Sequence, residues 1–204
     1  MRLFAMLFLL AAVPLAQAQG RSTQRAQVQA VWGLQQLMQS LAQVREASAS
    51  FTERDTSPVL SAPLISTGTL TYVAPEYLRK VTISPVPERF VLNHENVTLN
   101  GGGGGGVHVF ALRQAPGIAG LVEAIRGTLA GNLPALEQFY TVSLTGSRPA
   151  WRLRLLPKDR ALRRFVRLIV ISGSKNQISM IDTASSDGGD SKMLIRADNQ
   201  LDAP

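Results

Sequence analysis

The sequence predicts an α+β protein built on an incomplete, unclosed antiparallel β-barrel, or curled sheet, with amphipathic helices covering the open mouth. Short segments of alternating apolar and polar residues fill residues 47–110 and 139–197, with Pro, Gly and Asn between them. Two segments with apolar residues at every third or fourth position stand before and between these regions. Because helices do not separate the strands one by one, as a parallel sheet requires, the predicted sheet is antiparallel and curls.

The first helix is predicted over residues 27–46, ahead of all the strands. Its apolar residues recur on one face, with Gln and Arg on the other, and they are Val28, Val31, Leu34, Leu37, Met38, Leu41 and Val44. Such a helix packs on the sheet, either as plain cover for a core or as part of a lid.

Strands are predicted from residue 47 to about residue 110. A short strand carries Phe51, and a second runs over 63–74 until Pro75 stops it, because proline lacks the N–H that a ladder needs. The chain then resumes at 77–81, and further short strands are expected at 81–84, 89–93 and 97–99.

Six consecutive glycines occupy residues 101–106. They satisfy the spacing of a phosphate-binding loop, but such a loop needs a following helix N-terminus. The next residues, 107–110, alternate as a strand does. A flexible hairpin tip is therefore the favoured interpretation.

A second amphipathic helix is predicted within residues 111–133, between two β-rich halves, with a further helical turn at 134–138. The apolar face comprises Ile118, Leu121, Val122, Ile125 and Leu129. It either covers the mouth of the curled sheet as a lid or belongs to a static core. The last third returns to strands, which are predicted at 139–145, 150–156, 165–172, 177–183 and 192–197.

The N-terminus carries the features of an export signal. Arg2 precedes an apolar run at residues 3–13, and Ala16-Gln17-Ala18 fits a cleavage site. We therefore expect a signal peptide over 1–18, a single domain over 19–204 and a periplasmic location. An uncleaved anchor is the alternative, but the run is shorter than the roughly 20 residues of a membrane span. The chain contains no cysteine, so no disulfide stabilises it.

Nothing in the residue pattern favours catalysis. The two histidines, His94 and His108, lack metal-ligand spacing, and no Gly-x-Ser-x-Gly motif is present. We expect no enzyme activity, no metal and no other cofactor. The formal net charge of +7 suits anionic surfaces such as lipid head groups, whereas nucleic acid is not expected because no motif for it is found.

The order of three pieces resembles the LolA family of periplasmic lipoprotein carriers. These pieces are Ser50-Phe51-Thr52-Glu53, then Gly68 to Pro75 with Leu78-Arg79, then Pro87 to Asn93. The resemblance implies a half-barrel that holds acyl chains, with the helical insert as part of its lid. It also implies a lipid or acylated lipoprotein as cargo, an inner-membrane transporter as donor, an outer-membrane acceptor and a monomeric carrier.

The expected cavity residues are the apolar residues that the strand and helix patterns place inward. Each has a plain core role as its alternative. They are Phe51, Leu70, Tyr72, Leu78, Phe90, Ile118, Leu121, Val122, Ile125, Trp151, Leu153 and Leu155.

A basic group is the strongest charge feature, and it is either a solvated face or a docking patch for anionic head groups or an acidic partner. The predicted docking residues are Arg152, Arg154, Arg163, Arg164 and Arg167.

Two departures from the family pattern bear on function. The carriers place an Arg just before the proline of the second piece, where it bonds to the lid, and Ala74 stands there in this chain. They also continue beyond the last strand, whereas this sequence ends at Pro204. The first hypothesis is a periplasmic carrier that shuttles a lipoprotein or lipid toward the outer membrane. The alternative is a non-catalytic adaptor domain of a lipid-export system, with no cargo of its own.

Overall fold

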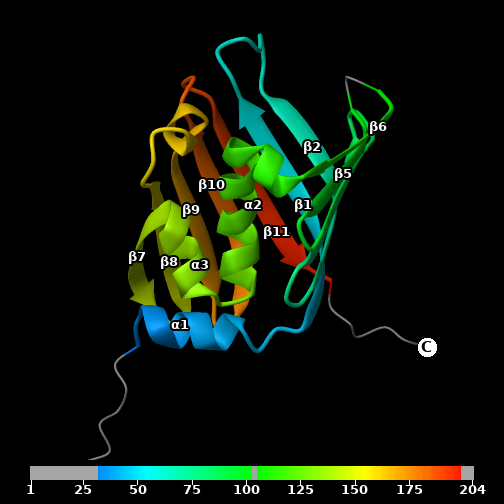
Figure 1. Cartoon of the computed structure of the whole chain (residues 1–204). Helices are drawn as coiled ribbons and strands as arrows, with labels where there is room; N and C mark the ends of the chain where they lie inside the picture. The colour runs from blue at the N-terminus through cyan, green and yellow to red at the C-terminus, as the bar shows by residue number, and fades with distance from the viewer. Residues whose placement is uncertain (1–31, 103–104, 199–204) are drawn as a thin grey trace, which may run out of the picture. The chain divides into compact units, whose positions relative to one another are not determined.

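The strands form one antiparallel sheet in the computed structural model, which describes residues 32–102 and 105–198. The eleven strands of this part of the chain are ordered β6-β5-β4-β3-β2-β1-β11-β10-β9-β8-β7 (Figure 1). Their bounds are β1 Glu46–Thr56, β2 Leu64–Val73, β3 Tyr77–Ser84, β4 Glu88–Asn93, β5 Asn96–Gly101, β6 Val107–Ala111, β7 Tyr140–Ser147, β8 Ala150–Pro157, β9 Val166–Ser174, β10 Gln177–Ser185 and β11 Asp190–Ala197.

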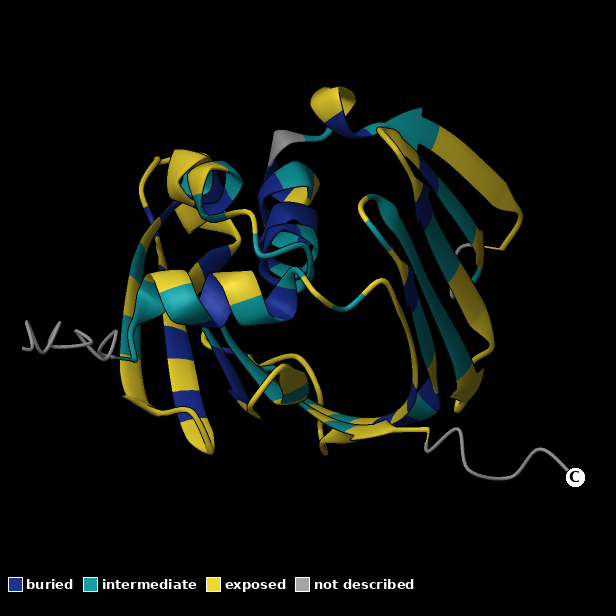
Figure 2. Cartoon of the chain, turned by 90° about the horizontal axis from the view of Figure 1, so that it is seen from below, coloured by how far each residue is buried: buried dark blue, intermediate teal, exposed yellow. Residues whose placement is uncertain are grey.

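The sheet curls but does not close. Each neighbour in the order is a hairpin partner except β1 and β11, which pair through residues such as Phe51 and Ile195. The outer strands β6 and β7 are not paired with each other among the described residues. Seen from below, the two halves of the sheet face each other across α2 (Figure 2). The predicted fold class is therefore confirmed.

The described part of the chain has three α-helices, which lie on the concave side of the sheet: α1 Leu34–Leu41, α2 Pro116–Leu129 and α3 Leu133–Phe139. Short 3₁₀ turns, Leu112–Gln114 and Leu162–Arg164, precede α2 and β9. Asn132 caps α3, because its side-chain oxygen accepts the N–H of Ala135 at 3.1 Å.

The predicted first helix was too long at its C-terminal end. The helix ends at Leu41, the chain turns, and β1 already begins at Glu46. Val44 continues the helical spacing, but Glu46 pairs with Val73 of β2, and this non-local ladder determines the structure there. Residues 27–31 of the predicted helix, like the signal peptide, lie outside the described residues.

The remaining elements follow the sequence predictions closely. Strand β2 ends at Val73, two residues before Pro75, and β3 begins at Tyr77. The glycine run joins β5 to β6, and Gly101, Gly102, Gly105 and Gly106 all have positive φ, which glycine adopts without strain.

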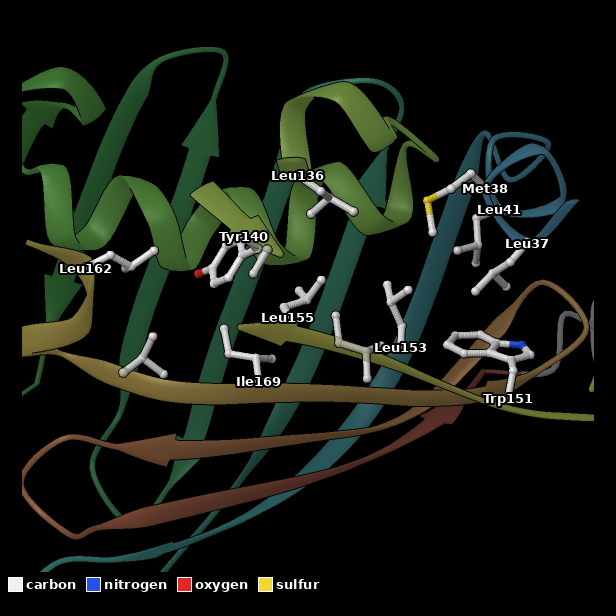
Figure 3. Close-up of a cluster of buried hydrophobic side chains, with 13 residues drawn as sticks. Leu37, Met38, Leu41, Leu136, Tyr140, Trp151, Leu153, Leu155, Leu162 and Ile169 are labelled. Carbon is white, nitrogen blue, oxygen red and sulfur yellow. The ribbon is translucent and has the colours of Figure 1, made fainter. Parts of the chain in front are cut away.

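Two groups of buried side chains pack against the concave face, one in each half of the sheet. The larger, which we call the large cluster, joins α1, α2 and α3 to strands β7–β9 (Figure 3). Its buried members are Leu37, Met38, Leu41, Ala124, Leu136, Tyr140, Trp151, Leu153, Leu155, Leu162, Val166, Ile169 and Ile171.

The second group, which we call the small cluster, joins α2 and the first 3₁₀ turn to β4 and β5. Its buried members are only Leu92, Val97, Leu112 and Val122. Helix α2 thus contributes Ala124 to the large cluster and Val122 to the small one. It lies between the two halves of the sheet and packs on both.

Candidate functional site on the concave face

The strand register identifies the residues that share the concave face. Directly paired residues of antiparallel strands point to the same face. Leu70 is opposite Ala49 on one side and Lys80 on the other, and Lys80 is in turn opposite Phe90. Phe90 faces Leu99 of β5. One row of mostly apolar side chains therefore crosses the N-terminal half of the sheet.

Three of the predicted cavity residues lie in the C-terminal half of the sheet, which the large cluster seals and which we call the sealed half. Trp151, Leu153 and Leu155 alternate along β8 and are at most 1% exposed, inside the large cluster. In Figure 3 they line up beneath the side chains of α1 and α3. The indole N–H of Trp151 donates to the carbonyl of Lys175 at 3.0 Å, so its polar atom is satisfied too.

The other half of the concave face is covered less completely. Leu70, Leu78 and Phe90 are only half-buried, although β2, β3 and β4 are internal strands with partners on both sides. Leu78 and Phe90 pack against the small cluster, so their partial exposure reflects incomplete cover above the sheet rather than an open edge. Phe51 and Tyr72, on the same face, are each 3% exposed.

Helix α2 presents a third face besides the two that enter the clusters. Leu121 packs on the large cluster and Val122 belongs to the small one. Ile118 and Ile125 are two helical turns apart, share one face and join neither cluster. Ile118 is 38% exposed and Ile125 is half-buried, so apolar surface on this helix is accessible.

A polar group interrupts the accessible row. The ammonium of Lys80 is 2.5 Å from Glu53 Oε2, and it lies 5.0 Å from the centroid of the Phe51 ring. Ser191 Oγ donates to Glu53 Oε1 at 2.7 Å. The Phe51 ring packs closely on the backbone of Gly68. A side chain at residue 68 would prevent this, because its Cβ would lie 2.7 Å from Phe51 Cε1.

This polar group was not predicted from the sequence, although β1 carries a signal for it. Phe51, Glu53 and Asp55 alternate along β1 and so must share a face with the aromatic residue. Asp55 is opposite Ser191 and half-buried. Burial raises the pKa of Asp55, and the negative charge of Glu53 raises this pKa further.

The position that lacks the family arginine lies in the turn between β2 and β3. Ala74 follows β2 in a turn, where its N–H donates to the carbonyl of Arg45 at 2.8 Å.

A different arginine holds α2 to the sheet. Arg126 pairs with Glu123 of the same helix at 2.6 Å, and with Glu95 in the turn between β4 and β5 at 3.2 Å. It also donates to the carbonyl of His94 at 3.4 Å. Burial lowers the pKa of Arg126, but the hydrogen bonds and charges of Glu123 and Glu95 outweigh burial and raise it.

The predicted docking arginines fall into two groups. Arg152 and Arg154 are exposed on the face of β8 opposite to Trp151 and Leu153. Arg163 and Arg164 lie in the 3₁₀ turn after β8, and Arg167 follows in β9. Arg163 and Arg167 also donate to backbone carbonyls, those of Pro157 and Ser185, at 3.1 and 2.8 Å.

Two surface depressions lie on the outer face of the sheet. One, of about 520 Å³, is lined by outward residues that include Arg54, Asp182 and Lys192. The other, of about 630 Å³, is lined by residues that include Arg152 and Ser172, at the other end of the sheet's outer face. Neither is the acyl-binding surface expected from the sequence.

No group of three or more His, Asp or Glu side chains in the described part of the chain is arranged to hold a metal ion. None of the helices described is both long and apolar enough to span a membrane.

Comparison with known proteins identifies a family. The family described as "Outer membrane lipoprotein carrier protein LolA-like" matches residues 25–203, which confirms the resemblance predicted from the sequence. Comparison with curated proteins gives no match.

Solved structures similar to this chain are distant. A LolA superfamily protein from Nitrosomonas europaea is 11% identical, with a TM-score of 0.43, over 85% of this chain and 96% of that one. A DUF1329 family protein from Desulfovibrio piger is 11% identical, with a TM-score of 0.42, over 83% and 93%. A chain of the MucA/MucB complex from Pseudomonas aeruginosa is 12% identical, with a TM-score of 0.39, over 84% and 61%.

Proposed function

The chain belongs to the outer membrane lipoprotein carrier protein LolA-like family, and from this we propose that it binds the acyl chains of a lipoprotein or lipid and shuttles them toward the outer membrane. The observation that carries the proposal is the partial exposure of Leu70 and Phe90 in the apolar row, and of Leu78 beside them, on internal strands. These side chains keep apolar surface that a ligand could cover.

The physical basis of binding is burial of apolar surface on both sides of the cargo. Each Å² removed from water contributes roughly 25 cal/mol. An acyl chain between the apolar row and the Ile118–Ile125 face of α2 would cover both. Of the predicted cavity residues, we propose that Leu70, Leu78, Phe90, Ile118 and Ile125 contact cargo. Phe51, Tyr72, Leu121, Val122, Trp151, Leu153 and Leu155 then support the wall from within the packed protein.

Release requires the cover to move, and α2 is the element that covers the accessible half. Arg126 is its polar attachment to the β4–β5 turn, through Glu95. We propose that this contact does the work that an arginine in place of Ala74 does in the carriers.

The remaining parts of the proposal concern place and partners. We propose that residues 1–18 are a cleaved signal peptide, that residues 19–204 act in the periplasm as a monomeric carrier domain, and that the chain catalyses no reaction. The donor is then an inner-membrane transporter and the acceptor lies at the outer membrane. The exposed Arg152 and Arg154 support docking on anionic head groups, which salt should weaken.

The test is native mass spectrometry with lipid extraction on protein purified from the periplasm. Co-purified acylated species support the carrier, and their masses distinguish a lipoprotein from a free lipid. Protein that is free of lipid and also fails to bind a fluorescent acyl probe would contradict it and favour an adaptor domain without cargo.

A further inference from the structure

The polar group on the concave face lies within the surface that we propose for the cargo. Lys80 occupies the position between Leu70 and Phe90 in the accessible row. Its side chain is 31% exposed, whereas that of its partner Glu53 is 14% exposed. A cargo lying along this row therefore meets an ammonium and, beside it, carboxylates.

The cost of this arrangement suggests a role other than stability. Removing charges from water is expensive, and apolar residues of similar size are often as good or better for stability. Here two carboxylates of β1, Glu53 and Asp55, lie on the same face of the sheet as Lys80 of β3, which pairs with Glu53. No salt bridge to Asp55 occurs within 4.0 Å among residues 32–102 and 105–198.

The chemistry of the group fits an ammonium better than an anion. Its formal charge is −1 when both carboxylates are ionised, so a head group that is only anionic is repelled. An aromatic face and a carboxylate already hold an ammonium here, since Lys80 lies over Phe51 and against Glu53. Asp55 offers a second ammonium the same kind of partner, and Lys80 offers a phosphate a cation.

We propose that Glu53, Asp55 and Lys80 form a head-group subsite for an amphiphile that carries a primary ammonium beside a phosphate, as an ethanolamine phospholipid does. This rests on the proposed function, because the acyl chains must lie along the apolar row. The ammonium is held by Asp55 and Glu53, and the phosphate by Lys80. The carrier then selects its cargo by the polar end as well as by the acyl chains.

The experiment compares three short-chain lipids with identical acyl chains, each displacing a fluorescent acyl probe from the full chain purified without detergent. They are phosphatidylethanolamine, the same lipid with its amine acetylated, and diacylglycerol. The ammonium of phosphatidylethanolamine can donate a charge-assisted hydrogen bond in this partly buried site, and acetylation removes that charge. We therefore expect phosphatidylethanolamine to bind about tenfold more tightly than its acetylated form. Diacylglycerol should lie between them.

The variant Asp55→Asn should reduce this preference to about threefold or less, because one of the two carboxylates that hold the ammonium is lost. Glu46→Gln is the matched control, since Glu46 is exposed on the opposite face of the same strand, and its preference should equal that of the wild type. Misfolding is not expected for Asp55→Asn, because burial makes the ionised carboxylate unfavourable there.

The outcomes separate the two proposals. Equal affinity of the wild type for the amine and its acetylated form would overturn the subsite while leaving the carrier intact. An unchanged preference in Asp55→Asn would also overturn the subsite. If the probe binds and none of the lipids displaces it, the subsite fails while the carrier stands. If the probe itself does not bind, the proposed function fails and the subsite fails with it.

Discussion

Strands β8 and β3 are internal strands in opposite halves of the sheet, yet they are buried in different ways. Along β8, residues alternate strictly between exposed and buried, and Trp151, Leu153 and Leu155 are almost inaccessible. Along β3, most residues on both faces are half-buried. The strand pattern fixes which face a side chain points to, whereas the layer above it decides how far the side chain is sealed.

The layers differ because the helices are distributed unevenly. Helices α1 and α3 and the 3₁₀ turn before β9 pack on β7–β9 together with α2. Among residues 32–102 and 105–198, the elements that pack above β4 and β5 are α2 and the 3₁₀ turn before it. The C-terminal half is therefore a stabilising core, and the N-terminal half retains the surface that we assign to cargo.

The largest effect should come from truncating a side chain in the sealed half. Leu153→Ala should lower the free energy of unfolding by about 3 kcal/mol, because it leaves a cavity in the large cluster. The matched variant Leu70→Ala, on the half-covered side, should cost less than about 1.5 kcal/mol. Urea unfolding measures both, and equal losses would contradict the division into sealed and accessible halves.

Removing the attachment of α2 should have the next largest effect. Arg126→Gln removes the cation beside the Glu123 carboxylate, whose side chain is 6% exposed. This loss should lower the free energy of unfolding by about 2 kcal/mol. Amide hydrogen exchange should quicken in α2 more than in β8. Arg113→Gln, an exposed residue just before the helix, serves as the control, and similar exchange in both variants would count against the attachment.

Filling the accessible surface should affect binding more than folding. Leu70→Trp places a bulky indole ring where cargo is expected and should weaken binding of a fluorescent acyl probe about tenfold. The free energy of unfolding should change by less than about 1 kcal/mol. Titration of the probe and a melting curve give both values. Unaltered probe affinity would remove Leu70 from the proposed contact surface.

The smallest effect concerns pH and Asp55. Because its pKa is raised in the folded protein, the folded state holds this proton more tightly than the unfolded state does. Its contribution to stability therefore falls as pH rises from the ordinary aspartate pKa to the raised one. Asp55→Asn should be slightly more stable than the wild type at pH 7, with the difference vanishing at acid pH. Melting curves of both proteins across this pH range test the prediction. A wild type that gains stability relative to Asp55→Asn as the pH rises would contradict it.

The strands were largely predictable because their signals are local. Alternation in 150–156 and the stop at Pro75 depend on neighbouring residues alone. The end of α1 was not predictable in this way, because the pairing of Glu46 with Val73 overrides the helical spacing that Val44 continues.

The site was predictable only in part, because accessibility depends on contacts far apart in the chain. The alternation of Leu70 and Tyr72 resembles that of Leu153 and Leu155, yet Leu70 is half-buried whereas Leu153 and Leu155 are sealed inside the large cluster. The pairing of Lys80 with Glu53 crosses the intervening strand β2 at Gly68, and no local spacing reveals it.

The position of α2 between the two clusters also links occupancy to stability. A ligand that binds only the folded chain stabilises it, by about 2.7 kcal/mol at a free concentration a hundredfold above its dissociation constant. Since α2 packs on both halves, this stabilisation should extend to the sealed half, where the cargo makes no contact. The exchange rates of amides in β8 and β9 would then report, from a distance, whether the carrier is loaded.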